Sequence, residues 1–481
     1  MIEIVKLLRG LFRAACLVII DLFAFYLSLL IAWTFRDEVL SSLVPNLPEF
    51  TFSFPYFLSL WWAPVIFIFF MLYEGLYERN LPFWDETRIT IKAISLATVA
   101  IMTIVTLGKM QDRISRLVLL GLWVASVFIF PAARLWGKRF LSRIGIWKER
   151  VLILGAGNAG RLTMEGLLRE RHMGYEVIGF LDDDEEKRGT IIAEKKVFGK
   201  VKHFPKFVKE LNITTVIIAM PSLSPEKLST LAAGVQNHSD NTVVIPDLKG
   251  IALINTELLH LFYEELFLMN IRNNLKSLPN RFIKRLFDMT IGALSMPLLL
   301  PLIGIIGTAI RLETPGPAIY SHDRIGKNGK TFRCYKFRTM QKDAEAKLKE
   351  ILGNDEESRS EWEKNWKLKD DPRITRVGRF LRRTSLDELP QIFNVIKGEM
   401  SLVGPRPYLL RELSTIEQQL HIICSTKPGI TGLWQVSGRS DTGYEYRLKL
   451  DSWYVMNWSL WFDIAIIFKT IKVVSKREGA Y

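Results

Sequence analysis

The stretch RFIKRLFDMTIGALSMPLLLPLIGIIGTAIR, residues 281–311, decides how the chain meets a lipid bilayer. Its apolar part, about Leu286–Ile310, is long enough to cross a hydrocarbon core of about 30 Å. Basic residues nevertheless flank both ends, namely Arg281, Lys284, Arg285 and Arg311. A crossing would carry one of these flanks to the far side, against the preference of basic residues for the cytoplasmic side.

Two prolines, Pro297 and Pro301, lie near the middle of this stretch. Proline removes a helix donor and clashes with the preceding turn, so we predict a sharp kink there. A broken helix over about 286–310 that enters and leaves the membrane on one face satisfies both the length and the charges. The alternative is an ordinary kinked crossing.

Four more apolar runs occur upstream: Ala14–Phe35, Pro55–Tyr73, Ala93–Leu107 and Leu117–Ala133. The first two are long enough to cross, and the last two are long enough only with their flanks. The first run is too long for a signal peptide and has no small-residue cleavage site. We therefore predict four transmembrane helices within residues 1–140.

Charges orient these four helices. Basic residues precede the first run and follow the last, whereas the loop 36–54 carries one basic and three acidic residues. Both ends of the bundle are therefore expected in the cytoplasm. Asp21, inside the first run, has two interpretations: a functional intramembrane carboxylate, or a structural polar contact, which is the interpretation we favour.

Composition limits the class of protein. With 481 residues the chain suggests about three domains, and its mean hydropathy of +0.14 fits a protein that is part membrane and part aqueous. The net charge of +14 suits nucleic acid, anionic lipid or phosphorylated substrates as partners. Three distant cysteines and six scattered histidines argue against a disulfide framework and a histidine metal site.

Residues 141–255 have the pattern of a small α/β domain. The apolar run Val151–Leu154 is followed by Gly155, Gly157 and Gly160 in G-x-G-x-x-G spacing. Further strands are predicted at Val177–Leu181, Thr215–Ala219 and Thr242–Ile245. This order predicts a Rossmann-like sheet with parallel strands.

The glycine loop of this domain has more than one interpretation. A dinucleotide site would place pyrophosphate on the glycines and a ribose on Asp182, and the enzyme would then be a membrane-bound oxidoreductase or epimerase. Alternatively the loop is only scaffold, or binds a regulatory ligand. Asp182 and Asp184 also form a D-x-D pattern of the kind that binds metal in sugar transferases.

An acidic pair among arginines stands out downstream. Residues 322–383 hold 18 Lys or Arg against 11 Asp or Glu, and Asp387 and Glu388 follow directly. Nearby arginines are Arg373, Arg376, Arg379, Arg382, Arg383 and Arg406. Arginine binds phosphate bidentately, and a carboxylate among arginines is expected to stay ionised, as a nucleophile or Mg²⁺ ligand.

These residues suit phosphoryl transfer. The plain alternative is that Ser385 and Glu388 form a capping box, which would make the acids part of a first helical turn. We predict no nucleic-acid partner, because no groove-reading or base-stacking module is recognisable.

Four segments, residues 313–340, 371–407, 427–440 and 451–481, resemble the bacterial sugar transferases, which are monotopic phosphoglycosyl transferases. The apolar N-terminus and Rossmann-like middle resemble the long form of that family. The resemblance implies an α+β catalytic domain over 281–481, a linker at 256–280 and a re-entrant helix. Its kink would rest on Pro301, although Leu300 stands where many members have serine.

The resemblance also implies an activity. A phosphosugar, with galactose phosphate expected, would pass from a UDP-sugar to undecaprenyl phosphate with release of UMP, through a covalent aspartyl intermediate. This is the first membrane step of surface polysaccharide synthesis. The protein would lie in the bacterial inner membrane with its catalytic domain on the cytoplasmic face, as a homodimer.

Residue roles follow from the matching motifs. Asp387 would be the nucleophile, and Glu388 would assist at the phosphates and at Mg²⁺, with both acids as metal ligands. Arg382 and Arg406 would bind phosphates. Lys336 and Arg338, in the YKFRTM motif, are further phosphate-binding candidates.

Overall fold

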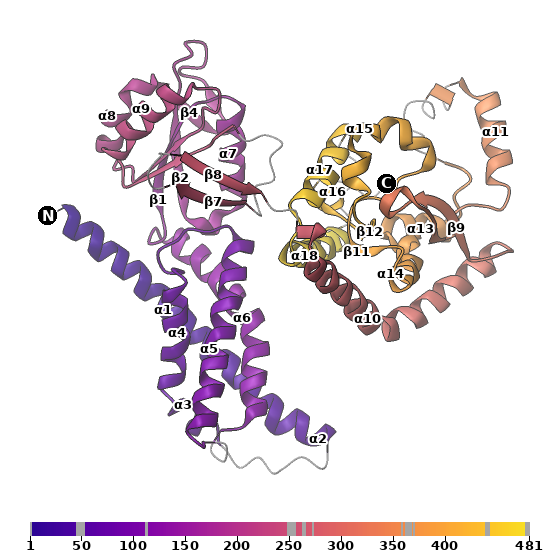
Figure 1. Cartoon of the computed structure of the whole chain (residues 1–481), viewed down its shortest axis with the longest axis horizontal. Helices are drawn as coiled ribbons and strands as arrows, with labels where there is room; N and C mark the ends of the chain where they lie inside the picture. Colours follow the sequence, from indigo (N-terminus) through magenta and orange to yellow (C-terminus); the bar gives the residue numbers. More distant parts are fainter. Residues whose placement is uncertain are drawn as a thin grey trace. The chain divides into compact units, whose positions relative to one another are not determined.

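The computed structural model describes residues 2–44, 53–110, 114–247, 256–261, 266–271, 274–356, 359–360, 368, 371–437 and 443–476. The chain forms two compact units, residues 1–248 and residues 249–481 (Figure 1).

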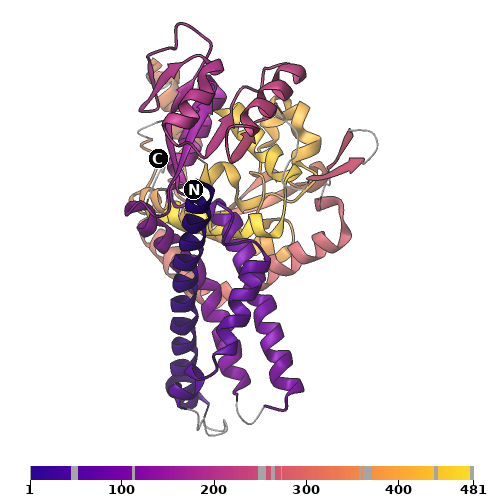
Figure 2. The same ribbon diagram turned by 90° about the vertical axis from the view of Figure 1, so that its left-hand side faces the viewer.

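The first unit begins with a helical bundle whose helices run alongside one another (Figure 2). Its members are α1 (Ile2–Thr34), α4 (Trp62–Tyr73), α5 (Phe83–Leu107) and α6 (Arg116–Arg143). α1 continues through a π-helical turn, η1 (Phe35–Leu40), into α2 (Ser41–Leu43). Three segments are long and apolar enough to cross a membrane: Leu8–Leu43, Phe83–Leu107 and Arg116–Arg143. Helices are therefore present over the first, third and fourth of the predicted apolar runs.

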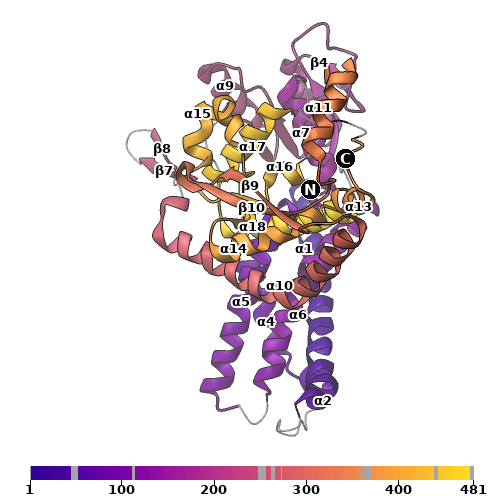
Figure 3. The same cartoon turned by 90° about the vertical axis from the view of Figure 1, so that its right-hand side faces the viewer.

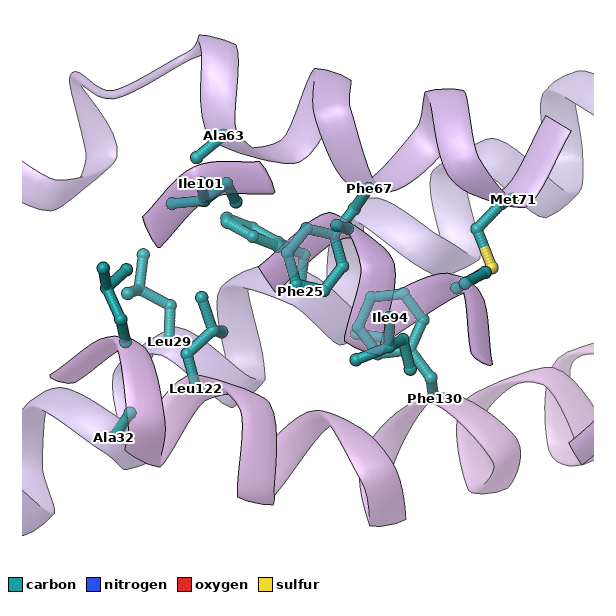
Figure 4. Close-up of a cluster of buried hydrophobic side chains, with 14 of the residues drawn as sticks. Phe25, Leu29, Ala32, Ala63, Phe67, Met71, Ile94, Ile101, Leu122 and Phe130 are labelled. Atoms are coloured by element: carbon teal, nitrogen blue, oxygen red, sulfur yellow. The ribbon is translucent and has the colours of Figure 1, made fainter. Parts of the chain in front are cut away.

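Aromatic side chains fill the centre of the bundle (Figure 4). Phe67 contacts Phe25 edge-on at 5.0 Å between ring centroids and stacks with Phe130 at 5.8 Å. These rings come from α1, α4 and α6, so they join three helices that are distant in sequence.

The second apolar run differs from its prediction. Instead of one crossing over Pro55–Tyr73, the structure has a short helix α3 (Phe54–Leu58), a break, and then α4. Pro64 lacks an N–H and its ring clashes with the carbonyl four residues earlier, which favours a kink or a break of the helix near residue 60. The 12 residues of α4 extend only about 18 Å, less than the hydrocarbon thickness.

A buried ion network crosses the bundle. Arg134 binds Asp21 at 2.7 Å and Glu86 at 3.0 Å, and Lys138 binds Glu86 at 2.7 Å. The Tyr77 hydroxyl donates to Asp21 at 2.8 Å. Two acids and two bases balance, with Arg134 only 1% exposed. Asp21 is thus a structural contact between α1 and α6.

A six-stranded sheet follows the bundle, in the order β3-β4-β2-β1-β5-β6, parallel except at β3. Its strands are β1 (Glu149–Leu154), β2 (Tyr175–Leu181), β3 (Ile191–Ile192), β4 (Lys195–Gly199), β5 (Thr215–Ile218) and β6 (Asn241–Val244). The helical segments are α7 (Asn158–Arg169), η2 (Arg171–Met173), η3 (Val201–His203), α8 (Phe204–Glu210) and α9 (Pro225–Gln236). The four predicted strands are confirmed, and the β3–β4 hairpin is additional.

The second unit contains a bent membrane-type helix, α10 (Leu278–Glu313), which is long and apolar enough to cross a bilayer. Figures 1 and 3 show that α10 bends near its middle and that both arms run from the bend toward the rest of the unit. Pro297 and Pro301 lie in its interior. Many of its apolar side chains are exposed, including Leu298 at 76% and Leu312 at 84%.

The rest of this unit is α+β. A hairpin of β7 (Thr256–Leu261) and β8 (Leu266–Ile271) occupies the segment expected to be a linker. The remaining strands are β9 (Ile319–Ile325) and β10 (Thr331–Phe337), which pair antiparallel, and β11 (Ser401–Val403) and β12 (Gly429–Thr431), which pair parallel. The α-helices are α11 (Ala344–Asn354), α13 (Arg376–Thr384), α14 (Ile392–Lys397), α15 (Leu413–Ile423), α16 (Leu433–Val436), α17 (Tyr444–Met456) and α18 (Leu460–Lys476). The short 3-10 turns are η4 (Asn274–Lys276), η5 (Lys327–Gly329), η6 (Leu386–Gln391) and η7 (Leu410–Glu412).

Replacing Arg134 tests the bundle network. Arg134→Met leaves Asp21 buried without its cation, so we expect a loss of about 3–5 kcal/mol of stability. Thermal unfolding in nanodiscs measures it, with Arg139→Met, an exposed arginine on the same helix, as the control. Equal midpoints for both variants would show that the network contributes little.

Two glycines of the α/β domain provide a matched comparison. A Cβ on Gly160 would lie 2.1 Å from the Gly155 carbonyl oxygen, whereas a Cβ on Gly157 would meet open space. Gly160→Ala should therefore lower the melting temperature by several degrees, while Gly157→Ala should not. An unchanged melting temperature in Gly160→Ala would contradict the close approach of α7 to the Gly155 carbonyl.

Candidate active site

The acidic pair lies against Lys336 of β10. Lys336 Nζ is 2.5 Å from Glu388 Oε1 and 3.9 Å from Asp387 Oδ2. Asp387 and Glu388 are 17% and 29% exposed at their side chains, so both are partly accessible. One ammonium group thus bridges two carboxylates that a substrate can reach.

A tight change of chain direction places these acids. α13 ends at Thr384, its C-cap Ser385 has a left-handed φ of 57°, and the 3-10 turn η6 begins at the next residue. Ser385 makes no side-chain hydrogen bond to the start of η6, so the capping box considered for Ser385 and Glu388 is not formed. A capping role therefore does not explain why two acids stand at positions 387 and 388.

The surroundings of the two acids shift their pKa values in opposite directions. Burial raises the pKa of Asp387 to about 6, opposed by Lys336 and reinforced by Glu388. Burial also disfavours ionised Glu388, but Lys336, Arg406 and Arg324 outweigh it, so the pKa of Glu388 lies below its usual value. The expectation that arginines keep these carboxylates ionised holds more strongly for Glu388 than for Asp387, because desolvation dominates at Asp387.

Three cations flank the pair in addition to Lys336. Arg382, at the end of α13, donates from Nε to Thr339 Oγ1 at 3.0 Å and favours the ionised form of Asp387. Arg406, in the loop after β11, has its guanidinium carbon 5.7 Å from the centre of the Trp434 ring. Arg324 was not among the predicted site residues.

Arg324 reaches the site through the hairpin register. It pairs with Phe332, and side chains at alternate positions of a hairpin share a face, so Arg324 lies on the same face as Lys336. Its Nη1 donates to the Pro407 carbonyl at 3.1 Å. Pairing the two strands around Asn328 and Gly329 would have revealed Arg324 from the sequence.

Other predicted arginines lie elsewhere. Arg338 donates to the Thr314 carbonyl at 2.7 Å and the Pro315 carbonyl at 3.0 Å, so its donors close the turn after α10. Arg373 forms a buried ion pair with Asp371 at 2.6 Å. On α13, a cavity of about 210 Å³ is lined by Arg376, Arg379, Phe380, Arg383 and Thr384.

The donor set at the acidic pair fits Mg²⁺. Among the described residues, no three or more His, Cys, Asp or Glu side chains gather into an all-protein metal cage. Mg²⁺ typically takes one or two carboxylates and receives its other oxygens from substrate phosphates and water. Asp387 and Glu388 would supply such carboxylates.

The glycine loop of the α/β domain is tied to its own acid. Asp182 Oδ2 accepts from the Ala156 amide at 2.7 Å, and Oδ1 accepts from the Asp184 amide at 2.9 Å. Gly155 has a φ of +100°, and Gly157 and Gly160 begin α7. The carboxylate considered for ribose binding thus already closes the loop.

Two family models match the chain. Residues 279–477 match "Bacterial sugar transferase", and residues 75–246 match "CoA-binding domain". The first match contains the acidic pair and α10, and the second contains the parallel sheet.

Similar curated proteins cover most of the chain. It is 41% identical to undecaprenyl-phosphate galactose phosphotransferase of Salmonella typhimurium, over 84% of each chain. It is 36% identical to UDP-galactose-lipid carrier transferase of Erwinia amylovora over the full length of both. It is 32% identical to UDP-glucose:undecaprenyl-phosphate glucose-1-phosphate transferase of Escherichia coli, over 72% of each. The chain therefore belongs to the bacterial sugar transferase family.

Proposed function

We propose that this protein transfers a phosphosugar from a UDP-sugar to undecaprenyl phosphate and releases UMP, as the first membrane step of surface polysaccharide synthesis. The observation that carries the proposal is the acidic pair on Lys336, in which Asp387 and Glu388 have different pKa values. Galactose phosphate is the proposed group, because relatives with 41% and 36% identity are named for galactose and the one named for glucose has 32%.

The proposed reaction has two displacements at one phosphorus atom. First, an Asp387 oxygen attacks the sugar-side phosphorus, and the bond to the bridging oxygen breaks as UMP leaves with the electron pair. Second, a phosphate oxygen of undecaprenyl phosphate attacks the same phosphorus and Asp387 leaves as a carboxylate. The products are UMP and undecaprenyl-diphosphosugar.

The cations around the pair would lower the cost of bringing anions together. Lys336, Arg382 and Arg406 would bind phosphate oxygens and hold the donor in line with Asp387. Glu388 would keep Lys336 charged and oriented, since the two form a 2.5 Å contact. Mg²⁺ bound by the two acids would supply further charge neutralisation on the diphosphate.

We further propose that α10 re-enters the membrane and lies with the active site at the cytoplasmic face of the inner membrane. The bend, the prolines and the exposed apolar side chains support this placement. Both substrates can then meet, because undecaprenyl phosphate stays in the bilayer and the UDP-sugar in water. By the long-form resemblance, the proposed assembly is a homodimer.

Removing the nucleophile is the direct test. Asp387→Asn keeps the size of the side chain but cannot form the acyl phosphate, so UMP release should fall by at least ~10³-fold. The assay uses full-length protein in nanodiscs with Mg²⁺, undecaprenyl phosphate and a panel of UDP-sugars. Asp323→Asn, an exposed acid on β9, is the control. Undiminished turnover in Asp387→Asn would refute the proposed mechanism.

The pH profile tests the electrostatics. Because the ionised form of Asp387 is the nucleophile and its pKa is about 6, kcat/KM should fall as the pH drops below about 6. Lys336→Met removes a cation that favours ionised Asp387, so the midpoint should move to higher pH. Lys330→Met, at an exposed lysine before β10, should leave the midpoint in place. Identical midpoints in all three proteins would exclude this assignment of the titrating group.

A further inference from the structure

Two arginines from different parts of the chain lie near the ring of Trp434. The guanidinium carbons of Arg406 and Arg447 lie 5.7 Å and 5.3 Å from the centre of its ring. Arg406 belongs to the loop after β11, Trp434 to α16 and Arg447 to α17. Guanidinium groups near an indole face gain from the ring's negative electrostatic potential, so Trp434 holds two like charges near each other.

The arginine cluster on Trp434 is connected to the acidic pair, Asp387 and Glu388. Arg406 favours the ionised form of Glu388. The carbonyl of the next residue, Pro407, accepts at 3.1 Å from Arg324, which lies on the Lys336 face of the β9–β10 hairpin. Burial and then Arg406 lower the pKa of Arg324 and of Arg447. Glu412 opposes this lowering of the pKa at both arginines, and a phosphate bound among the guanidinium groups would oppose it further.

A buried acid joins the backbone of Arg406 to the helix that carries Arg447. Asp451, fully buried on α17, accepts from the Arg406 backbone N–H at 3.1 Å and from the Tyr408 hydroxyl at 2.7 Å. Arg447 lies one turn earlier on the same helix. The loop that carries Arg406 is thus fastened to the helix that carries Arg447, which preorganises the pair.

Arg382 and Arg406, the cations that act on Asp387 and on Glu388, come from different elements of the unit. Arg382 acts on Asp387 and comes from α13, whose Val377 and Leu381 pack in the same cluster as Leu302 and Ile303 of α10. That side adjoins the membrane-type helix, where a lipid phosphate would arrive. Arg406 favours ionised Glu388 and comes from the loop after β11, beside α16 and α17, so Arg382 and Arg406 reach the acidic pair from different elements.

We propose that Arg447, together with Arg406 on the Trp434 ring, forms the subsite for the UMP half of the donor diphosphate. The inference rests on the proposed function and deepens it. A sugar nucleotide has two phosphates: Asp387 attacks the sugar-side phosphate, and the nucleotide-side phosphate needs its own donors. Two guanidinium groups provide them in a geometry that a single lysine cannot reproduce. The same subsite would hold the leaving UMP, whose phosphate gains charge when the bridging bond breaks.

The test compares Arg447→Gln with Lys449→Gln in full-length protein in nanodiscs. Lys449 is an exposed lysine two residues further along α17, so the charge change is the same. In Arg447→Gln we expect KM for the UDP-sugar and the inhibition constant of UMP to rise together by about tenfold or more. KM for undecaprenyl phosphate should stay within about twofold, and Arg447→Lys should recover part of the loss. Lys449→Gln should match the wild type.

Direct UMP binding to the wild type and to Arg447→Gln, measured by calorimetry, separates this inference from the proposed function. If the wild type releases no UMP from any UDP-sugar, the proposed function fails. If the wild type turns over and Arg447→Gln keeps normal KM and UMP affinity, only the subsite assignment fails. A rise confined to KM for undecaprenyl phosphate would also overturn it.

A melting curve checks that Arg447→Gln is folded. Should that variant unfold, Trp434→Leu replaces it, since loss of the ring removes the platform for both arginines. The expected result is the same joint rise in KM for the UDP-sugar and in the UMP inhibition constant. Unchanged values in a folded Trp434→Leu would overturn the inference.

Discussion

The second unit depends on a buried ion pair between Lys284 of α10 and Asp463 of α18, 2.6 Å apart. A buried pair is tolerated only when its remaining hydrogen-bonding capacity is used. Here Lys284 also donates to the Val403 carbonyl at 3.0 Å, while Tyr454 and Trp458 donate to Asp463 at 2.6 Å and 2.9 Å. The pair therefore ties the membrane-type helix to the end of β11, immediately before the loop of Arg406. Asp288 of α10 adds to this connection, because its Oδ1 accepts from the Ser401 hydroxyl at 3.0 Å and from the Leu402 amide at 3.1 Å.

Within this unit, Lys336 and burial give the two acids of the pair, Asp387 and Glu388, different pKa values. Two adjacent carboxylates would ordinarily repel each other, but Lys336 sits between them and is closer to Glu388. Lys336 and nearby arginines therefore hold the pKa of Glu388 below its usual value, while burial raises the pKa of Asp387 to about 6. Environments that separate the pKa values of paired acids also separate their roles. The nucleophile role proposed for Asp387 calls for a carboxylate that is ionised at neutral pH yet weakly solvated, and a pKa of about 6 with a side chain 17% exposed is compatible with both conditions.

Much of this could be predicted from the sequence where the signal is local. Continuous apolar runs predicted the strands β1, β2, β5 and β6, and the clustering of arginines pointed to the acidic pair. The β3–β4 hairpin was missed because its turn uses Ala193 and Glu194 at positive φ, without the usual Asn-Gly signal. Arg324 was missed because the β9–β10 hairpin register was not drawn, and the turn role of Arg338 was missed because it depends on a contact with Thr314, which is distant in sequence. Residue type alone does not distinguish an arginine that binds phosphate from one that closes a turn.

The same difficulty affects charge-based topology. Arg134, Lys138 and Lys284 were counted as basic flanks of membrane segments, yet all three are buried in ion pairs. Arg285 likewise donates to the carbonyls of Val395 and Ile396 at the end of α14. Such residues contribute structure, so counting them as free positive charges overstates the bias that orients a helix. The bend of α10, its interior prolines and its exposed apolar surface therefore support the proposed re-entry more strongly than its flanking charges do.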